Sequence, residues 1–381
     1  MVHAGTNSGG FSCPLNLELR THRHEHYVAA SCDYVNAVQL RTKFAMLLAP
    51  IVALHLLDWI MMTETLAARP AIRLISLKNP GDDVLRPVIA IGNFDGAHRG
   101  HRAVAQTAHT LRDSLPGAGP VTALTFEPHP RAFFQPQPPL FRLTLAEDRA
   151  ARLAAIGFEA LALIAFDAEL AATSAEAFVQ HLLVERLNVA AVVVGQDFHF
   201  GKGRQGTPEF LVEAGRRYGF AVHFVESYRD EAGAIVSSSA IRASLAEGDL
   251  ATANRMLGYS YAVSGEVIHG AKRGRELGYP TANIALHPGN GLRHGIYAVR
   301  IEIDGEPRAG VASFGRRPMF DNGAPLLEVF VIDFTGDLYG KRVTVSFEAF
   351  LRGEARFDSL EALIRQMDAD QAEARRILAQ Q

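Results

Sequence analysis

Short apolar runs alternate with longer amphipathic stretches between residues 87 and 226, and this alternation constrains the fold more than any other feature of the chain. A continuous apolar run bounded by turn residues is typical of a strand buried on both faces of a parallel sheet. Such runs occur in PVIAIGNF, VTALTFEPHP, ALALIAF, AAVVVG and AVHFVE. Strands that alternate with helices predict an α/β fold with a doubly wound, Rossmann-like parallel sheet, whose ligands bind beyond the C-terminal ends of the strands.

The segments between these runs carry helix-start and helix-stop signals. A threonine stands three residues before a glutamate, which is capping-box spacing, or directly before a proline: Thr144 with Glu147, Thr173 with Glu176, and Thr207 with Pro208. Gly157 is placed to end one of these helices in a left-handed cap. Helices are therefore expected over HRAVAQTAHTLRDSL, from Thr144 to Gly157, over AFVQHLLVERL and from Thr207 onward.

After Gly258 the pattern changes to consecutive strand-like segments without helices between them. They are YAVSGEVIHG, GIYAVRIEIDG, EPRAGVASFG, APLLEVFVIDF and RVTVSFEAFL, rich in Val, Ile and Phe and separated by turn residues. Such a series predicts a closed antiparallel β-barrel, covered on one side by the final amphipathic helix SLEALIRQMDADQAEARRIL. We therefore expect an α/β domain over residues 71–250 and a barrel domain over residues 259–381.

The N-terminal residues 1–70 differ from the rest and are expected to be an extension outside the fold. The tract HRHEH is typical of solvated coil rather than of a metal site. The apolar run Phe44–Met62 is nearly long enough to cross a bilayer, but it contains Asp58 and lacks a basic flank with a cleavage site. A membrane anchor or signal stays open; the alternative is a start assigned too early, with the working protein beginning at Met61 or Met62.

Charge and cysteine content exclude several classes of protein. The chain has 38 Lys+Arg against 41 Asp+Glu and a formal net charge of -3, so it lacks the basic field of proteins that bind nucleic acid non-specifically. Its two cysteines, Cys13 and Cys32, support neither a disulfide framework nor a cysteine-based zinc site. We expect a cytoplasmic protein with small-molecule ligands and with no nucleic-acid or membrane partner, while a homo-oligomer stays open.

The stretch GNFDGAHRGH follows the first apolar run and combines glycines with two histidines. Gly92 and Gly96 let the backbone approach a ligand, and the start of the next helix offers free N–H groups to a phosphate. His98 and His101 would share one helix face and can donate hydrogen bonds in either protonation state. Such a pair suits nucleotidyl transfer, in which the protein neutralises charge on phosphates and supplies no nucleophile. Two surface histidines beside a turn are the alternative.

Three further polar segments follow predicted strands, where the ligand-binding loops of such sheets lie. They are FEPHPRAFF, GQDFHFGKGRQGT and VSSSAIR. In the last of these, the serines Ser237–Ser239 can cap a helix and bind phosphate oxygens, while Arg242 can clamp them. A serine run before a helix is by itself usually only an N-cap, so the prediction depends on the combination.

The barrel region has no G-x-x-x-x-G-K-[ST] loop, which excludes a P-loop kinase. It begins with HGAKRGRELGYPTANI, whose glycines and basic residues suit a loop that encloses phosphates, although a hairpin connection would look similar. Thr281 and Asn283 present two neutral oxygens on one side of a strand, and Mg²⁺ accepts such ligands alongside ATP. In LLEVFVIDF, residues 326 to 334 alternate so that Glu328 is the only carboxylate on an apolar stripe. It either pairs with a base or accepts a proton.

The order of these motifs resembles that of a known family. The chain reads G-N-F-D-G-A-H-R-G-H, F-E-P-H-P, G-Q-D-F-H-F-G, V-S-S-S-A-I-R and P-T-A-N, and from about residue 88 nearly to its end it resembles the bacterial bifunctional riboflavin kinase/FAD synthetases, or FMN adenylyltransferases. The resemblance implies ATP-dependent phosphorylation of riboflavin to FMN at the barrel, then adenylylation of FMN to FAD at the α/β domain. It also implies Mg²⁺ with ATP, and release of pyrophosphate in the second step.

The resemblance assigns roles to residues of this chain. In the α/β domain it implies catalysis by His98 and His101, nucleotide contacts from Gly92, Asn93, Phe94, Gly96, Ser238, Ser239 and Arg242, and flavin contacts from Pro128, Pro130 and Asp197. In the barrel it implies catalysis by Glu328, nucleotide contacts from Gly270, Lys272, Gly274, Arg275, Thr281 and Asn283, Mg²⁺ at the last two, and flavin contacts from Arg352 and Glu354. For Arg352 and Glu354 a surface charge pair stays open.

The chain departs from the family pattern at Phe330, where histidine is frequent, and at Ser313 and Met319, where Asn and Thr are common. These departures concern flavin contacts more than the chemistry. Two alternative functions stay open: an H-x-G-H adenylyltransferase for another phosphorylated acceptor, and a non-catalytic flavin-binding sensor.

Overall fold

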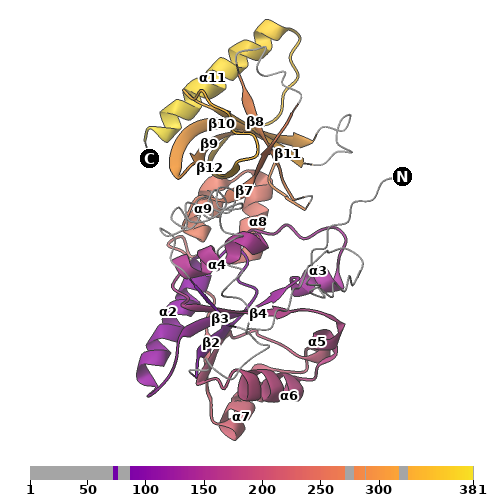
Figure 1. Ribbon diagram of the computed structural model, residues 1–381, viewed down its shortest axis with the longest axis vertical. Coiled ribbons are helices and arrows are strands. Elements are labelled where there is room, and N and C mark those ends of the chain that lie inside the picture. The colour runs from indigo at the N-terminus through magenta and orange to yellow at the C-terminus, as the bar shows by residue number, and fades with distance from the viewer. Residues whose placement is uncertain (1–71, 76–85, 271–278, 288, 317–324, 381) are drawn as a thin grey trace, which may run out of the picture. The chain divides into compact units, whose positions relative to one another are not determined.

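The structure is a computed structural model of the 381-residue chain, and it describes residues 72–75, 86–270, 279–287, 289–316 and 325–380 (Figure 1). All described residues belong to one compact unit, Ala67–Gln381. The sequence features of the N-terminal stretch, including both cysteines and the apolar run Phe44–Met62, therefore lie outside the described residues.

Six parallel strands form the sheet of the α/β domain, in the order β1-β4-β3-β2-β5-β6. They are β1 (Arg73–Leu74), β2 (Val88–Ile91), β3 (Val121–Glu127), β4 (Ala160–Ala165), β5 (Ala191–Gly195) and β6 (Ala221–Val225). The five predicted strands are all present, and β1 is an addition because two residues give no readable period. The strand order reverses between β2 and β5, and open sheets of this kind bind ligands at such a point.

Helices pack on both faces of this sheet. They are α2 (Arg99–Ser114), α3 (Pro130–Phe134), α4 (Ala146–Ala155), α5 (Ala168–Ala172), α6 (Ala175–Ala177), η1 (Phe178–Arg186), η2 (Lys202–Arg204) and α7 (Pro208–Tyr218). Alternate residues of β2 belong to different cores: Val88 and Ala90 cluster with residues of α2 and α4, whereas Ile89 and Ile91 cluster with residues of η1 and α7. This two-sided burial explains the continuous apolar runs and confirms the doubly wound sheet.

Two of the three predicted helix starts are wrong. α7 begins as expected, with the Thr207 hydroxyl accepting from the Phe210 N–H and Pro208 in the first turn. The Thr144 hydroxyl instead accepts from the N–H of Gly96, and α4 begins after Leu145. Ser174, one residue after the predicted threonine, caps α6. In both cases the threonine hydroxyl is engaged elsewhere: that of Thr144 with the Gly96 N–H, and that of Thr173 with the Glu169 carbonyl oxygen. The segment η1 continues α6 as a π-helix, where an α-helix was expected.

Helices α8 (Ser238–Glu247) and α9 (Leu250–Leu257) follow the sheet and lead into the barrel. Each ends at a glycine with positive φ, Gly248 at +80° and Gly258 at +80°, where a side chain would strain the backbone. These left-handed caps redirect the chain twice within a few residues.

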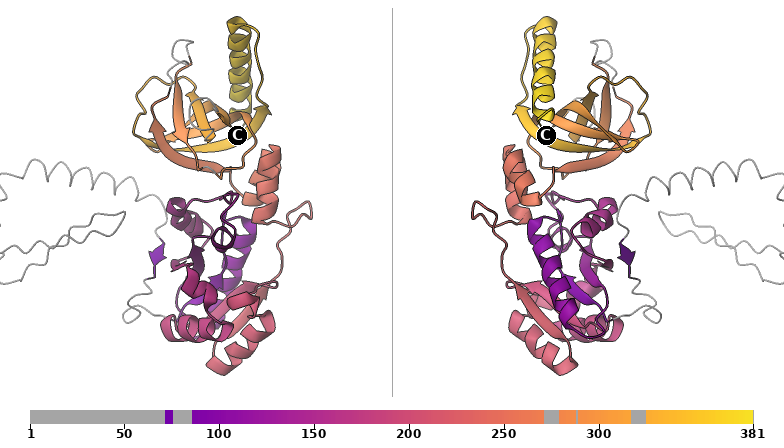
Figure 2. Two further views of the ribbon diagram at one scale, coloured as in Figure 1. Left: turned by 90° about the vertical axis from the view of Figure 1, so that its right-hand side faces the viewer. Right: turned by 90° about the vertical axis from the view of Figure 1, so that its left-hand side faces the viewer.

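Six strands close the barrel in the order β10-β11-β8-β7-β12-β9. They are β7 (Ala262–Ile268), β8 (Thr281–Ala285), β9 (Gly295–Ile303), β10 (Glu306–Arg316), β11 (Pro325–Val331) and β12 (Arg342–Arg352). Val299, Leu327, Val329 and Val345 are fully buried in its interior. Helix α11 (Leu360–Leu378) runs alongside the barrel and contacts β9, β10 and β12 (Figure 2). The predicted barrel with a covering C-terminal helix is confirmed.

Among the residues that the structure describes, no helix has both the length and the apolar character needed to cross a bilayer.

Candidate functional site

The paired histidines stand at the start of α2, directly beyond the C-terminal end of β2. The turn that joins β2 to α2 passes through Gly96. This glycine has φ +90°, and a side chain there would press against Leu143. His98 is the N-cap of α2, and its Nδ1 accepts a hydrogen bond from the His101 N–H at 3.3 Å. Because Nδ1 accepts, the proton of the neutral His98 ring is on Nε2. The two imidazoles stack, with ring centroids 3.6 Å apart.

Both imidazoles are neutral at physiological pH. Burial lowers the pKa of His98 to about 4, an effect that the charge of Arg242 increases and that of Asp95 opposes. Burial and the neighbouring His98 also hold the pKa of His101 well below its usual range. The pair can therefore donate hydrogen bonds to a phosphate, but the positive charge of this site comes from other groups.

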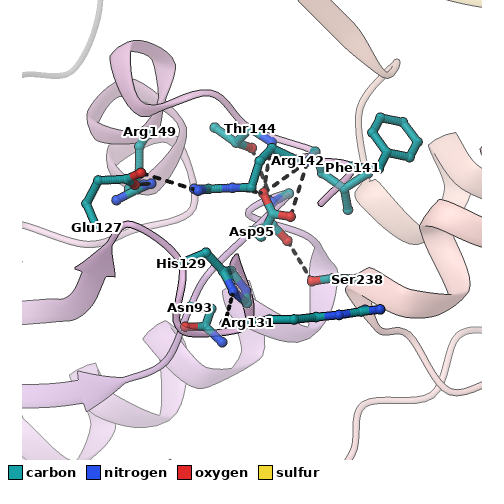
Figure 3. Close-up of polar contacts among 12 residues, drawn as sticks. Asn93, Asp95, Glu127, His129, Arg131, Phe141, Arg142, Thr144, Arg149 and Ser238 are labelled. Atoms are coloured by element: carbon teal, nitrogen blue, oxygen red, sulfur yellow. Dashed lines mark hydrogen bonds and ion pairs between the residues drawn. The ribbon is translucent and has the colours of Figure 1, made fainter. Parts of the chain in front are cut away.

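One source of charge is Arg242 in α8, which the sequence placed at the nucleotide. Its guanidinium pairs with Asp95 and donates from Nε to the Phe141 carbonyl oxygen at 2.6 Å. The Ser238 hydroxyl donates to the Asp95 carbonyl oxygen at 2.7 Å (Figure 3). Ser237 caps α8 by accepting from the Ala240 N–H. The serine run therefore both caps the helix and ties its first turn to the GNFDG turn.

Asp95 is a central residue that the sequence analysis missed. Its side chain is 1% exposed, and one carboxylate oxygen accepts from the N–H groups of Leu143 and Thr144, both at 3.0 Å (Figure 3). A buried carboxylate requires such partners, because an unpaired one costs several kcal/mol or more. The sequence feature that could have indicated Asp95 is the presence of an acidic residue inside a glycine-rich turn.

A cavity of about 840 Å³ lies beyond the ends of β2 to β5. Residues predicted for the nucleotide or the flavin line it: Gly92, Asn93, Pro130 and Asp197. Aromatic and basic residues complete the lining, among them Phe126, Phe134, Phe166, Phe198, Phe200, Arg131, Lys202 and Arg204. Pro128 lies just before the lining residues His129 and Pro130 in the chain. Phe94 is buried and is not part of the lining; its ring lies edge-on to that of His101, with 5.1 Å between the ring centroids. The cavity suits a ligand with an aromatic body and an anionic end.

His129 also lines this cavity and was not singled out in the sequence. Its Nδ1 accepts from the Arg131 N–H at 3.0 Å at the start of α3, so a neutral His129 carries its proton on Nε2, as His98 does. Burial lowers its pKa to about 4, and the charge of Arg142 contributes further. The sequence feature that could have indicated His129 is its position between two prolines, in a loop that follows a strand.

In the barrel, strand pairing brings the predicted kinase residues together. Glu328 on β11 lies opposite Asn283 on β8, and Phe330 lies opposite Thr281. Leu327 and Val329 fill the barrel interior, so the other face of β11 is the one that bears Glu328. β11 ends at residue 331, so the predicted stripe covers fewer residues than expected.

A cavity of about 590 Å³ lies over this outer face. Its lining combines strand residues with the segment before α11 and with α11 itself: Thr281, Ser313, Glu328, Phe330, Arg352, Glu354, Phe357, Met367, Asp370 and Gln371. Gly270 packs over Asn283, because a side chain at Gly270 would come within 2.5 Å of the Asn283 Cγ atom. Lys272, Gly274, Arg275 and Met319 lie outside the described residues.

Arg352 is held by α11. It makes a two-pronged ion pair with Asp370, from Nε to Oδ1 at 2.9 Å and from Nη2 to Oδ2 at 2.7 Å. Gln366 donates to the same Oδ1 at 2.9 Å. Among the described residues, the ion-pair partner of Arg352 is therefore Asp370, not Glu354. No sequence pattern indicated Asp370, because it lies in a helix whose spacing predicted only amphipathicity.

Among the described residues, no cluster of three or more His, Cys, Asp or Glu side chains forms a ready-made metal site. The neutral oxygens of Thr281 and Asn283, beside the carboxylate of Glu328, fit an ion that keeps several waters and binds mainly through substrate phosphates. Mg²⁺ is such an ion.

Comparison with known proteins matches both halves of the chain. A family model described as FAD synthetase matches residues 83–240, and one described as riboflavin kinase matches residues 257–378. The bifunctional riboflavin kinase/FMN adenylyltransferase of Pseudomonas fluorescens is 42% identical over 294 residues, which make up 77% of this chain and 93% of that protein. This chain belongs to that family. The protein of the same name from Escherichia coli K12 is 39% identical and aligns with 76% of this chain and 91% of its own length.

A solved structure shares the fold of both domains. It is a crystal structure described as a macrolide-efflux protein from Streptococcus pneumoniae, with 30% identity and a TM-score of 0.70, covering 80% of this chain and 99% of that one. Family membership gives the chain two activities, phosphorylation of riboflavin to FMN and adenylylation of FMN to FAD. The alternatives of another phosphorylated acceptor and of a non-catalytic sensor match neither family description.

Proposed function

We propose that each activity has its own cavity: FMN is adenylylated at the 840 Å³ cavity of the α/β domain, and riboflavin is phosphorylated at the 590 Å³ cavity of the barrel. The observation that carries this assignment is the strand register that sets Glu328 opposite Asn283, in a domain separate from the stacked His98 and His101. A proton acceptor beside neutral oxygen ligands suits phosphorylation of an alcohol. Uncharged imidazole donors suit a reaction whose nucleophile is already an anion.

In adenylyl transfer, an oxygen of the FMN phosphate bonds to the α-phosphorus of ATP. The bond from that phosphorus to the bridging oxygen breaks, and pyrophosphate leaves with the electron pair. His98, from Nε2, and His101 donate to the phosphates, and Arg242 supplies the charge. Phe94 packs edge-on against the His101 ring and supports its position.

In the kinase reaction, the 5′-hydroxyl oxygen of riboflavin bonds to the γ-phosphorus of ATP, its proton passes to the Glu328 carboxylate, and ADP leaves with the electron pair. Thr281 and Asn283 would hold the Mg²⁺ that accompanies ATP, and the ion would neutralise phosphate charge. Gly270 leaves room for the Asn283 amide, because a side chain at this position would collide with it.

The remaining assignments follow the two cavities. At the α/β domain, Gly92, Asn93, Gly96, Ser238 and Ser239 approach the nucleotide, while Pro128, Pro130 and Asp197 shape the flavin site. At the barrel, Lys272, Gly274 and Arg275, which lie outside the described residues, are assigned to the nucleotide, and Arg352 and Glu354 to the flavin. Six of these residues line their cavity and thereby support the proposal: Gly92, Asn93, Pro130, Asp197, Arg352 and Glu354.

We assign residues 71–250 to the adenylyltransferase domain and residues 259–381 to the kinase domain, and residues 1–70 to an extension that neither activity requires. The matched ranges 83–240 and 257–378 support these bounds. With two cysteines in 381 residues and with small-molecule substrates, the chain suits the reducing cytoplasm, which cell fractionation would check.

Separate substitutions test the two sites. H101A should convert riboflavin to FMN and stop there, because the imidazole pair is lost while the barrel is intact. E328Q should leave riboflavin unphosphorylated but convert added FMN to FAD, since a proton acceptor contributes about 10²- to 10⁴-fold to such a reaction. Chromatography of the flavins after incubation with Mg-ATP distinguishes these outcomes.

The two variants also control for each other. Mixed together with riboflavin and Mg-ATP, they should restore FAD, because the FMN released by H101A is a substrate for E328Q. Loss of both activities in each single variant would contradict two separate sites.

A further inference from the structure

Five charged side chains form an alternating series across the ends of β2 and β3. Two carboxylates stand between three guanidinium groups, in the order Arg149, Glu127, Arg142, Asp95, Arg242. Figure 3 shows Arg142 extending between Asp95 and Glu127. The proposed function uses Arg242 only, and it leaves the middle of the series, Arg142, without a role.

The two outer arginines are well bonded and the middle one is not. Arg149 pairs closely with Glu127, and Arg242 pairs closely with Asp95. Arg142 reaches Asp95 Oδ1 from Nε at 3.7 Å and Glu127 Oε1 from Nη1 at 3.5 Å. Its Nε makes no hydrogen bond within the described part of the chain, although the side chain is only 13% exposed. A buried guanidinium with long contacts contributes little to stability, because desolvation offsets its attraction.

The two carboxylates belong to different sides of the proposed adenylyl site. Asp95 holds the nucleotide side, through Arg242 and through the Ser238 hydroxyl bonded to its carbonyl. Glu127 is the last residue of β3 and begins the segment that carries His129 on the cavity wall. Among the described residues, Arg142 is the one side chain that forms an ion pair with both.

Electrostatics point to the same bridging position. Burial acts to raise the pKa of Glu127, but the hydrogen bond from Arg149 and the charges of Arg142 and Arg149 outweigh it and lower that pKa. After burial, the charge of Arg142 is the largest influence on the pKa of His129. Arg142 therefore lies close to the flavin-side loop as well as to Asp95.

We infer that Arg142 is a positioning residue for adenylyl transfer, which sets the nucleotide side and the flavin side of the site at a fixed separation by bridging Asp95 and Glu127. The inference rests on the proposed function of this cavity. Each side keeps its own ligand contacts without the bridge, so binding of ATP and of FMN should persist. The approach of the FMN phosphate to the α-phosphorus depends on the separation, and a misplacement of about 1 Å costs on the order of 10²-fold in rate.

Steady-state kinetics of R142M and R142K test the bridge. R142M removes the charge at similar length, and its kcat for FAD formation from FMN should fall by about 10²-fold, with KM values for ATP and FMN within about threefold of the unmodified chain. R142K keeps the charge but can make only one of the two contacts, and its kcat should fall by about 10-fold. Riboflavin kinase activity should be unchanged in both variants.

The matched control is R112M, because Arg112 is a partly buried arginine of the same domain whose pairs with Asp113 and Glu159 lie away from the cavity lining. Its kcat for FAD formation should stay within about twofold. Two results would overturn the inference. One is a kcat for R142K within twofold of that of the unmodified chain. The other is a loss of activity in R142M that appears in KM alone.

A measurement independent of turnover uses the His129 imidazole. In R142M the pKa of His129, followed by NMR, should rise, whereas in R142K it should stay near its starting value because the charge is kept. An unchanged His129 pKa in a folded R142M would also overturn the bridge; if R142M does not fold, the kcat of R142K decides. An unmodified chain that makes no FAD from FMN would defeat the proposed function, whereas normal FAD formation by R142K would defeat this inference alone.

Discussion

Single residues of the adenylyl site are set by backbone contacts. His98 and His129 come from different loops, yet in each the Nδ1 atom accepts a backbone N–H at a helix start. That contact selects the ring proton at Nε2, and burial keeps both rings neutral, with a pKa of about 4 in each case. Neutral donors cost less to bury than cations, so charge is left to the arginines.

The buried His98 should make folding stability depend on pH. An unfolded histidine binds a proton below about pH 6.5, whereas the folded His98 does so only below about pH 4. Between these values the unfolded state binds more protons, so stability is lost as the pH falls. The loss from His98 should be about 2 kcal/mol between about pH 7.5 and pH 5.

Urea unfolding of H98N at both pH values measures this loss. Asparagine caps helices well but does not titrate, so the variant should lose about 2 kcal/mol less than the unmodified chain over the same range. Equal losses in the two proteins would show that His98 is not kept neutral by the fold.

Among the elements, α11 does more than cover the barrel. It presents Asp370, 6% exposed, to Arg352 at the rim of the kinase cavity. Asp370 holds Nε and Nη2 of the guanidinium, and the Gly353 carbonyl oxygen accepts from Nη1, so the guanidinium plane is fixed and its remaining N–H groups are pre-oriented for a ligand. The helix therefore shapes the site through an ion pair as well as through packing.

D370A should lower kcat/KM of riboflavin phosphorylation by about 10- to 10²-fold, because it releases Arg352 and leaves a partly buried charge unpaired. FAD formation from added FMN should be unaffected. The control is D333A, which removes the exposed ion pair with Arg375 on the same helix and should change both activities and stability little. A D370A enzyme with full kinase activity would separate Arg352 from the flavin site.

At the scale of the whole molecule, Ala67–Gln381 forms a compact unit that contains both proposed sites. The relatives align with roughly three quarters of this chain, and the family models begin at residue 83. A chain of residues 71–381 should therefore keep both activities within about twofold, and its thermal unfolding should be unchanged within about 2 °C. Flavin chromatography and calorimetry provide the measurements, and loss of either activity would assign the extension a role.

Local periodicity determined most of the fold, because burial on two faces, burial on one face and helical amphipathicity each leave a different spacing in the chain. The runs that became β2 to β6 and the barrel strands other than β8 could be read in this way. β1 could not, since two residues contain no period. The helix starts at Thr144 and Thr173 failed because a hydroxyl near a helix start bonds to whichever partner the tertiary structure brings closest.

The sequence by itself determined which loops bear the chemistry: glycine-flanked histidines after one strand, a serine run before a helix, and Thr281, Asn283 and Glu328 in the barrel. Only the tertiary structure decided how these groups are supported. The links from Asp95 to Arg242 and from Asp370 to Arg352 join residues 147 and 18 positions apart. The bridge through Arg142 joins two loops. Such pairs leave no spacing in the sequence, because a buried charge is satisfied by proximity in space and the chain sets that proximity only after it has folded.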